Sequence, residues 1–486
     1  MARVCVIGAG FAGHTAALYL GDKLGRDHQV TVINRTPDFV YIPSLVWVGI
    51  DRMDIGKTLF DLEKVYRKLN VAFIAGKATE VHPDGQFVMA VPNSVPNSVP
   101  NAEGSEPVRV DYDYLLIATG PKLDFEATPG LGPAAGNTWS ICSPPHAVEA
   151  RDHYLEAVSR MEKGERQRIV IGTGHGAATC QGAALEYISN VHKDLVRRNV
   201  RTKCDLAYLS NEPALGDFGI RGLSVNHRGK RTTAEDFISA VFKDYEIEPL
   251  VGRSVTGVDT GVAGWQDMEG NSGETKFDYA MLIPRFLGQP LKFLGAEGQD
   301  VSDKIVNPAG FVSVDGIYGL DYETLAGNPD AWPAVYQNPN YRNIFAAGIA
   351  FAPPGPISRP HVNPNGVPVS PAPPRTGMVS GIIGRIVALN IIDLVKDGRM
   401  THSERMTEMA AACIASMGDS LWDGSAAVIM VHPIVPDNRR YPNDEGRDPF
   451  VTHMEMGLAG AWMKRMIHTT FMHKLQGRIG WKIIPE

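Results

Sequence analysis

The sequence lacks the marks of several classes of protein. Its cysteines are few, odd in number and widely scattered, so they do not form a secreted disulfide framework, and none has the spacing of zinc ligands. They are Cys5, Cys142, Cys180, Cys204 and Cys413. We expect no metal site. The sequence contains no apolar run of 18 residues, so we expect no membrane-spanning helix. No signal peptide is expected before the first apolar segment, which already has the pattern of a strand.

An excess of positive charge is also missing. The formal charge of −7 gives no reason to expect a nucleic-acid partner. Hydrophobic residues make up 44% of the chain and charged residues 21%, which is an ordinary globular composition. A chain of 486 residues is too long for one hydrophobic core and predicts two or three domains.

A glycine motif close to the amino end gives the first positive signal. The apolar residues 3–7 lead into Gly8-Ala9-Gly10-Phe11-Ala12-Gly13. Gly8 allows a tight turn, Gly10 lets the backbone approach a pyrophosphate, and Gly13 lets the following helix lie close to the strand. The helix that starts after Gly10 offers free N–H groups to a phosphate. This unit predicts a dinucleotide site.

A second unit of the same kind lies about 160 residues further on. It reads Ile169-Val170-Ile171-Gly172-Thr173-Gly174-His175-Gly176, with altered glycine spacing. Between the two units, residues 114–120 predict a buried strand that ends in the small-residue turn Ala118-Thr119-Gly120. One such motif alone is weak, but the duplication indicates an α/β flavin enzyme with two Rossmann-like dinucleotide-binding domains.

The residue that follows the second strand departs from the usual dinucleotide-binding pattern of the first motif. Residues 29–33 predict this strand, and Asn34 follows it where an acidic side chain usually holds the ribose of a dinucleotide. Asn34 can still donate or accept a hydrogen bond. After the second motif, Glu212 is the residue that could hold a ribose.

The motifs divide the chain into four parts. Residues 1–145 are expected to form the first part of an FAD-binding domain, 146–276 a second Rossmann-like domain and 277–395 the second part of the first domain. In this division the strand at 277–284 returns the chain to the first domain, and a further buried strand leads to Gly348. A Pro-rich stretch from 353 to 374 is too apolar for a solvated linker, so we expect it to pack over a flat part of the fold, and a helix is expected from Thr376.

Residues 396–486 are expected to form an amphipathic, membrane-associating region. Residues 458–475 place apolar side chains at helical spacing, with Lys464, Arg465 and His468 off that stripe. A tail helix docked on the core competes with an amphipathic helix on a membrane surface. Trp481 and the surplus of Lys and Arg favour the membrane. Trp462, Met463, Met466, Ile467, Phe471 and Trp481 would then enter the interface, while Lys464, Arg465, Lys474 and Arg478 meet anionic headgroups.

Several short patterns then give a resemblance to a known family. They are residues 41–48 (YIPSLVWV), 118–123 (ATGPKL), 140–142 (SIC) with His146, 179–182 (TCQG) with Glu186-Tyr187, 343–350 (NIFAAGIA) and 374–377 (PRTG). The chain resembles the sulfide:quinone oxidoreductases almost from end to end. These flavoproteins belong to the superfamily with two dinucleotide-binding domains, which also contains flavocytochrome c sulfide dehydrogenase and type II NADH dehydrogenase.

The resemblance implies an FAD enzyme that oxidises sulfide or a related sulfur compound and reduces a quinone. Carried onto this sequence, it implies cofactor contacts from Gly8, Gly10, Phe11, Gly13, Asn34, Arg35, Ala118, Thr119, Gly120, Gly348, Ile349, Arg375 and Thr376. It also implies that Cys180 carries the sulfur, assisted by Cys142 and His146. The enzyme is expected to be peripheral, on the cytoplasmic side of the inner or cell membrane.

The cysteines themselves allow two interpretations. Cys180 follows the second glycine loop at a helix N-terminus, where the helix dipole favours a thiolate. The competing interpretation is a small buried hydrophobe that packs the helix onto its sheet. Cys5 and Cys204 fall inside strands and are expected in the core. Cys413, in an apolar segment at 409–415 that we expect to be helical, is expected there too.

The chain departs from the family pattern at three positions. The family uses a third cysteine near the strand that ends at Gly348, and here no cysteine occurs between Cys204 and Cys413. Asp217 stands where a family histidine is expected. Arg375 replaces the usual lysine, which keeps a positive charge near the flavin or quinone but cannot be deprotonated. The flavin and quinone parts therefore keep the pattern, while the sulfide part departs from it.

Two other functions remain open at this point. One is an NADH:quinone oxidoreductase on the same scaffold. The other is a flavoprotein subunit that passes electrons to a partner protein, and a homo-oligomer is also open.

Overall fold

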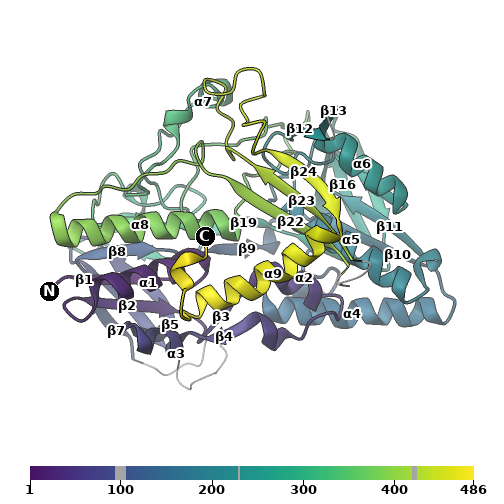
Figure 1. Cartoon of the computed structure of the whole chain (residues 1–486). Helices are drawn as coiled ribbons and strands as arrows, with labels where there is room; N and C mark the ends of the chain where they lie inside the picture. Colours follow the sequence, from purple (N-terminus) through teal and green to yellow (C-terminus); the bar gives the residue numbers. More distant parts are fainter. Residues whose placement is uncertain (94–105, 228–229, 419–423) are drawn as a thin grey trace.

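The computed structural model describes residues 1–93, 106–227, 230–418 and 424–486. Two sheets built mainly of parallel strands lie in opposite halves of the molecule, the first on the side of the amino terminus and the second on the far side (Figure 1). Most of the Val-Pro-Asn-Ser repeat at 91–101 lies outside the described residues.

The first sheet has the strand order β21-β8-β1-β2-β5-β6-β7, and β20 also pairs with β5. The strands from β21 to β5 run parallel, and β6 and β7 add an antiparallel meander. The bounds are β1 Arg3–Ile7, β2 Gln29–Asn34, β5 Ala72–His82, β6 Phe87–Pro92, β7 Val108–Asp111, β8 Tyr114–Ile117, β20 Lys292–Phe293 and β21 Ile344–Ala346. Four of the five residues of β1 are buried, as expected where helices cover both faces of a parallel sheet.

The second sheet is wholly parallel, in the order β14-β11-β10-β18. Its strands are β10 Gln167–Thr173, β11 Cys204–Leu209, β14 Ile247–Leu250 and β18 Tyr279–Ile283. The division proposed at 276/277 was wrong for β18, because this strand pairs with β10 and completes the second sheet. The chain returns to the first half only afterwards, where β19 (Arg285–Gly288) pairs with β9 (Pro121–Asp124).

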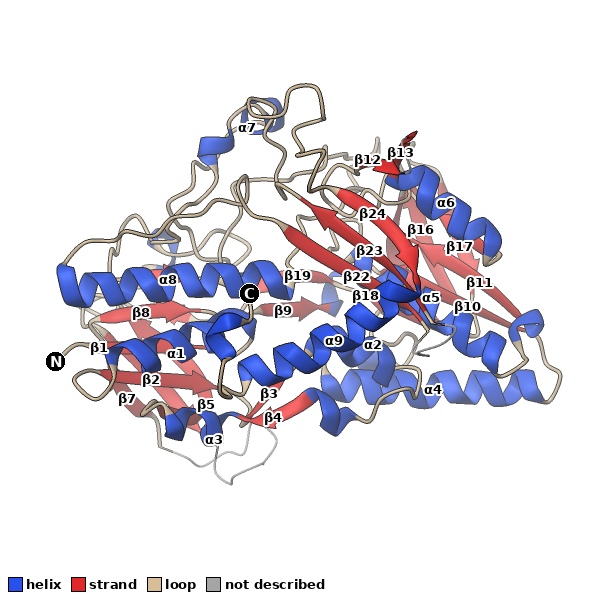
Figure 2. Cartoon of the chain, in the orientation of Figure 1, coloured by secondary structure: helices blue, strands red, loops and turns tan. Residues whose placement is uncertain are grey.

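Helices fill the space around both sheets (Figure 2). They are α1 Phe11–Leu24, α2 Leu45–Val48, α3 Leu62–Lys68, α4 Pro144–Glu162, α5 Gln181–Arg197, α6 Ala234–Asp244, α7 Tyr322–Ala326, α8 Gly377–Asp397 and α9 Leu458–Leu475. Helices α1 and α8 pack so closely that a Cβ on Gly384 would come within 2.2 Å of the Ala12 carbonyl oxygen. The expected helices at 376–395 and 458–475 are confirmed.

Helix α8 corrects the expectation that no segment has the character of a membrane-spanning helix. Among the described residues it is the one helix that is long and apolar enough to cross a membrane. However, 67% of its most apolar window is buried against the rest of the chain. A core helix passes the same test of length and hydropathy, and the packing against α1 explains the apolar sequence.

Besides the β9–β19 pair, four smaller antiparallel units occur in the described residues. Three of them are β12–β13 (Ser224–His227, Lys230–Thr233), β15–β16–β17 (Arg253–Asp259, Val262–Asp267, Ser272–Lys276) and β3–β4 (Asp38–Val40, Leu59–Asp61). A fourth, β22–β23–β24 (Ala411–Met417, Ser425–Val431, His453–Gly457), precedes α9. Cys413 lies in β22, so the expected helix at 409–415 was wrong. A short apolar run does not distinguish a buried strand from a buried helix.

Candidate active site

The first glycine loop is open on its outer side. It joins β1 to α1, and Gly8 adopts φ +97° at the turn. A Cβ on Gly13 would come within 1.9 Å of the Gly8 carbonyl oxygen, so only glycine lets the helix lie this close. A Cβ on Gly10, in contrast, would meet no atom within 4 Å. Gly10 caps α1 without a side-chain hydrogen bond, so the first N–H groups of the helix are left for a ligand.

Asn34 has a structural role beside this loop. Its side-chain oxygen accepts a hydrogen bond of 2.9 Å from the Ala9 N–H, and its amide donates to Thr36. Asn34 therefore holds the glycine loop in place instead of presenting a free amide to a ribose. Arg35, next along the chain, is exposed, and its carbonyl accepts from the Asn93 amide.

The N-terminus of α8 lies beside the first glycine loop and, like that of α1, has no side-chain cap. Thr376 precedes it, and the Thr376 hydroxyl is buried without a hydrogen-bond partner. Gly377 lies against the Phe11 ring, with a Cβ position 3.2 Å from it, so the starts of α1 and α8 are neighbours. A buried hydroxyl without a partner costs free energy unless a ligand satisfies it. The expected FAD fits this arrangement, which offers two helix N-termini and one orphaned hydroxyl.

The remaining expected cofactor residues surround the same region. Ala118 and Thr119 lie against Gly8. The approach is so close that a Cβ on Gly8 would be 2.2 Å from the Ala118 carbonyl oxygen. Gly120 follows with φ +67° and has open space beside it. Gly348 (φ +67°) touches Ala12 of α1, and the Ile349 carbonyl accepts a hydrogen bond of 2.6 Å from the Arg375 guanidinium.

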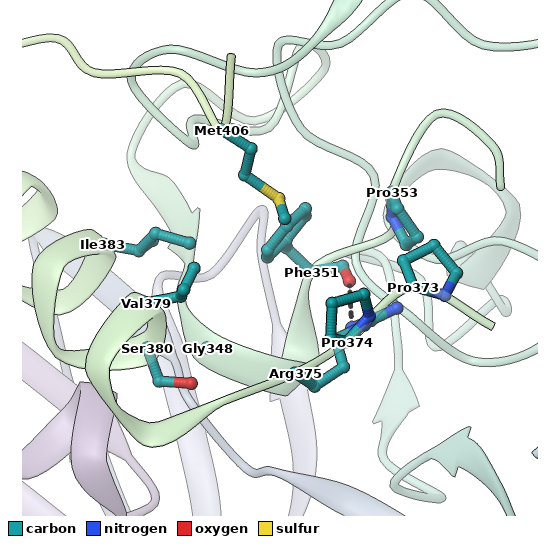
Figure 3. A pocket seen from close by; sticks show the side chains of 10 residues that line it. All are labelled: Gly348, Phe351, Pro353, Pro373, Pro374, Arg375, Val379, Ser380, Ile383 and Met406. Atoms are coloured by element: carbon teal, nitrogen blue, oxygen red, sulfur yellow. Dashed lines mark hydrogen bonds between the residues drawn. The ribbon is translucent and has the colours of Figure 1, made fainter. Parts of the chain in front are cut away.

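Figure 3 shows a pocket between these segments and the Pro-rich stretch. Its empty volume is about 280 Å³, and it is lined by Gly348, Phe351, Pro353, Pro373, Pro374, Arg375, Val379, Ser380, Ile383 and Met406. The Phe351 carbonyl accepts the second Arg375 hydrogen bond, at 2.9 Å, which the dashed line marks. The expectation that the Pro-rich stretch packs against the fold is confirmed here.

The second glycine loop differs from the first, because other segments of the chain occupy the space beside its glycines. Residues 368–375, which we call the strap, run alongside it. A Cβ on Gly176 would come within 1.7 Å of the Pro368 carbonyl oxygen, and one on Gly174 within 2.7 Å of Leu131. Backbone and side-chain bonds fix the strap: Ser370 N–H to Gly176 O (2.9 Å), Ala372 N–H to Ala178 O (3.1 Å) and Thr179 Oγ1–H to Pro373 O (3.0 Å).

Glu212, the residue that could hold a ribose beside this loop, and its neighbour Asn211 are both hydrogen-bonded within the protein. The Asn211 amide donates to the carbonyls of Gly176 and Ala178. Glu212 is buried and accepts from the Tyr208 and Ser210 hydroxyls and from the Phe218 N–H. Burial raises the pKa of Glu212 to about 7, more than these hydrogen bonds lower it. Glu212 is therefore not presented to a ribose.

Asp217 is a buried structural residue. Its carboxylate accepts from the Ser358 hydroxyl and the Gly219 N–H, and burial raises its pKa. The Arg447 guanidinium lies near enough to lower that pKa in part. The side chain therefore ties the loop after β11 to the Pro-rich segment.

Cys180 lies at the base of the strap as the N-cap residue of α5. It adopts φ +70°, a left-handed conformation that costs about 1–2 kcal/mol for a residue with a side chain. Burial, the largest cause, and the neighbouring Cys142 together raise the pKa of Cys180 to about 12. The expectation that the helix dipole favours a thiolate at Cys180 is thereby corrected, because burial disfavours the charged form by more than the dipole favours it.

His146 is less closely connected to the thiols. It lies in the first turn of α4, its ring meets Phe125 edge-on at 5.7 Å, and burial lowers its pKa. Its Nδ1 atom is buried without a partner. In the described part of the chain His146 makes no hydrogen bond to Cys142 or Cys180, so it is an imidazole with one unused nitrogen near the end of the second sheet.

Cys413 is the neighbour of Cys180 that the sequence did not reveal. Its Sγ lies 3.5 Å from the Cβ position of Gly182, in the first turn of α5. A thiolate at Cys413 would raise the pKa of Cys180, and burial raises the pKa of Cys413 itself to about 11. The expected core position is thus partly right, but β22 puts this thiol beside the start of α5.

A second polar cluster joins α5 to α9 on the other side of β22. Lys464 forms a buried ion pair of 3.1 Å with Glu186, and Ser416 of β22 also donates to that carboxylate. Nearby, the Ser44 hydroxyl and His468 Nδ1 are 2.8 Å apart, and Tyr41 packs edge-on against the His468 ring. That these residues meet could not be predicted from the sequence, because they are distant along the chain.

Comparisons with known proteins agree with this architecture. The family model described as pyridine nucleotide-disulphide oxidoreductase matches residues 2–202. The sulfide-quinone reductase of Aquifex aeolicus is 27% identical over 92% of this chain and 87% of its own. The crystal structure of the sulfide:quinone oxidoreductase from that bacterium superposes with a TM-score of 0.76 at 25% identity, covering 98% of this chain and 92% of the other. The type II NADH:quinone oxidoreductase of Haemophilus influenzae is 29% identical over only 32% of this chain and 34% of its own.

Proposed function

We propose that this chain, an FAD-binding homologue of the sulfide:quinone oxidoreductases, oxidises sulfide or a related small sulfur compound and passes the electrons to a quinone. The fold is that of the pyridine nucleotide-disulphide oxidoreductases, and the chain is an oxidoreductase flavoenzyme. FAD, when bound, supplies the two-electron oxidation. The donor and the acceptor are the parts of the activity that we propose here.

The single observation that carries the choice of donor is the contrast between the two glycine loops. The first is open at Gly10, whereas the second is filled by the strap at Gly176 and by Leu131 at Gly174. A nicotinamide dinucleotide needs a free glycine loop and a free group for its ribose. Here the chain occupies the loop, and Glu212 is bonded within the protein. A small donor such as HS⁻ needs neither.

The sulfur side is built from the residues around Cys180. A thiolate there can form one S–S bond with sulfide, provided that the two electrons released are accepted. We assign the onward transfer of the sulfur to Cys142, the first neighbouring group that influences the pKa of Cys180. The unpaired Nδ1 of His146 faces no protein partner, and it can accept a proton from sulfide that enters this part of the fold.

The acceptor side is proposed at the junction of α2, α5 and α9. A quinone needs an apolar path from the bilayer and a source of protons. Glu186, Lys464 and His468 supply titratable groups, with Tyr41 and Phe471 as aromatic walls. This location supports a quinone as acceptor more directly than a partner protein.

The experiment that tests the donor follows the visible absorption band of the bound flavin. Sulfide added without oxygen is expected to bleach the band within seconds, because the thiol site lies beside the cofactor region. NADH at the same concentration is expected to bleach it at least about 100-fold more slowly, since the second loop is filled. Rapid bleaching by NADH with none by sulfide would reject the proposal and favour the NADH:quinone function.

The outer surface of α9 and the residues after it support membrane association. Ile479, Ile483, Met466, Trp462 and Met463 are exposed apolar side chains, the first two at 99% and 87%. Ile467 and Phe471, which were expected in the interface, are half-buried against the core. The expected positions of three further residues were wrong, because Lys464 pairs with Glu186, Lys474 pairs with Glu486, and Trp481 is buried against Tyr19. These three side chains are unavailable to headgroups or lipid.

Changing exposed residues tests this surface more cleanly than removing α9, whose end packs against α1. Ile479→Ser with Ile483→Ser is expected to weaken binding to anionic liposomes by about 10-fold or more, since each apolar side chain contributes about 1.5–3 kcal/mol when buried. Co-sedimentation measures it. The matched control is Ile317→Ser, an exposed isoleucine elsewhere in the fold, which should leave binding unchanged. Equal binding by all three proteins would place the anchor elsewhere.

A further inference from the structure

The residues that follow α9 have an inner and an outer side. Residues 476–486, which we call the carboxyl segment, fold back beside α1 and α8 (Figure 1). Trp481 of this segment is buried, and its ring meets Tyr19 of α1 edge-on, with 5.1 Å between the ring centroids. Ile479 and Ile483, two residues before and two after Trp481, are exposed. The segment therefore presents an indole to the protein and two apolar side chains to the outside.

A buried ion pair fastens the far end of the carboxyl segment. Lys474, in the last turn of α9, forms an ion pair of 2.8 Å with Glu486, and both side chains are buried. The same carboxylate accepts a hydrogen bond of 3.1 Å from the Tyr19 hydroxyl. On its other oxygen it lies 3.3 Å from the Cβ position of Gly381 in α8. The Glu486 carboxylate thus lies where α1, α8 and the end of α9 meet.

Further contacts join the segment to the second half of α1. Trp481 packs in one apolar cluster with Leu18 of α1 and Val65 of α3. The next residue, Lys482, forms an ion pair of 2.6 Å with Asp22 of α1. The inner side of the carboxyl segment is therefore attached by apolar packing and by two ion pairs, although the segment is short and its outer side is exposed.

The two helices that this segment holds are those that begin at the expected FAD site. Helix α1 follows Gly10, and α8 follows Thr376 with its unpartnered hydroxyl. A helix is stiff, so a contact that fixes its second or third turn also restrains the direction of its first N–H groups. A site that is held in its binding geometry before the ligand arrives loses less conformational freedom on binding. Docking of the segment should therefore strengthen the binding of FAD.

We propose that the carboxyl segment is a latch through which contact with a lipid bilayer tightens the binding of FAD. The docked segment presents Ile479 and Ile483 as a fixed pair, whereas a detached segment would lose conformational freedom when it presents them. A bilayer that buries both side chains therefore favours the docked form, and the docked form holds α1 and α8 in place. The inference rests on the membrane association proposed above and adds a regulation to it.

The coupling between the two sites has to be reciprocal. If a bilayer raises the affinity for FAD by some factor, bound FAD raises the affinity for the bilayer by the same factor. Couplings of this kind are typically about 5–150-fold. The holoprotein is therefore expected to bind anionic vesicles about 10-fold more tightly than the apoprotein, although FAD itself touches no lipid.

The test measures how fast the full-length holoprotein releases FAD after dilution, followed by flavin fluorescence, with and without vesicles of phosphatidylcholine and phosphatidylglycerol. Vesicles are expected to slow release from the wild-type protein about 10-fold. Ile479→Ser with Ile483→Ser is expected to release FAD at the wild-type rate in solution, because the inner side is intact, but to show no slowing by vesicles.

A variant on the inner side separates the latch from the lipid contact. Trp481→Ala keeps both isoleucines but removes the indole from Tyr19, so release in solution is expected to be about 10-fold faster and vesicles should slow it less than twofold. Tyr19→Phe, which keeps the ring and removes only the hydrogen bond to Glu486, is the milder second variant. The matched control is Lys292→Met, whose ammonium lies 3.7 Å from Glu80 at the surface, and it should behave as the wild type.

Co-sedimentation of the same samples reports vesicle binding separately. Binding of the wild-type protein without any change in FAD release would overturn the latch and leave the membrane surface in place. Equal slowing of the wild type and Trp481→Ala would also overturn it. If the wild-type protein does not bind vesicles, both the membrane surface and the latch are rejected. Sulfide and quinone are absent from the assay, so the result does not depend on the proposed donor and acceptor.

Discussion

Replacing Cys180 with serine is expected to slow the bleaching of the flavin by sulfide about 1,000-fold or more. A serine hydroxyl keeps the size of the side chain and the left-handed backbone of the N-cap, but it is neither a soft nucleophile nor a group that can bind sulfur. Stopped-flow absorbance under nitrogen measures the rate, and the flavin spectrum before mixing shows whether the cofactor is bound.

Two other cysteine variants are compared with this one, Cys204→Ala as the matched control and Cys142→Ser as a second member of the proposed sulfur site. Cys204→Ala removes a thiol from the core of the second sheet, distant from the strap, and should leave the bleaching rate within about twofold of the unmodified enzyme. Cys142→Ser should fall between the two, because Cys142 lies beside Cys180 without capping α5. Normal bleaching by Cys180→Ser would remove this thiol from the chemistry and leave Cys142 as the sulfur carrier.

The two glycines of the first loop are expected to separate cofactor binding from folding. Gly10→Ala should fold normally, because its Cβ meets no protein atom, yet lose FAD affinity by about 100-fold, because the methyl group takes the space of the pyrophosphate. Gly13→Ala should lose both, since its Cβ would collide with the Gly8 carbonyl oxygen and overpacking costs about 1–3 kcal/mol or more.

Flavin fluorescence titration of the apoprotein and thermal unfolding measure these two effects. Gly136→Ala is a useful comparison, because it has open space but φ +72°, so it reports backbone strain alone, far from the loop. If Gly10→Ala binds FAD as tightly as the parent protein, the open side of the loop is not the pyrophosphate site.

Much of the fold follows from local patterns in the sequence. The two strand–glycine units became β1–α1 and β10–α5, because a run of buried apolar residues before a glycine turn has few alternatives. The helix at 458–475 was predicted to the residue. The segment around Cys413 was not, since a seven-residue apolar run suits a buried strand and a buried helix equally well.

The site was only partly accessible to such reasoning. The glycines, Cys180 and Cys142 could be found because each lies in a motif. The surroundings of Cys180 could not: the strap meets the second loop by tertiary packing, and its Pro373 carbonyl accepts from Thr179, 194 residues away in the sequence. The charged residues outside the apolar stripe of α9 show again that tertiary partners cannot be predicted from local patterns. Lys464 looked solvated by its position, but its partner Glu186 is 278 residues distant in sequence.

Helix α9 fastens the two halves of the molecule to each other. Near its start Lys464 is paired with Glu186 on α5, and at its end the Leu475 carbonyl lies 2.6 Å from His14 Nε2 on α1. A hinge motion between the two sheets would have to break a buried ion pair or expose a buried imidazole. The helix thus links the two halves through one contact near each of its ends, and a motion that separates the halves would have to break at least one of these contacts.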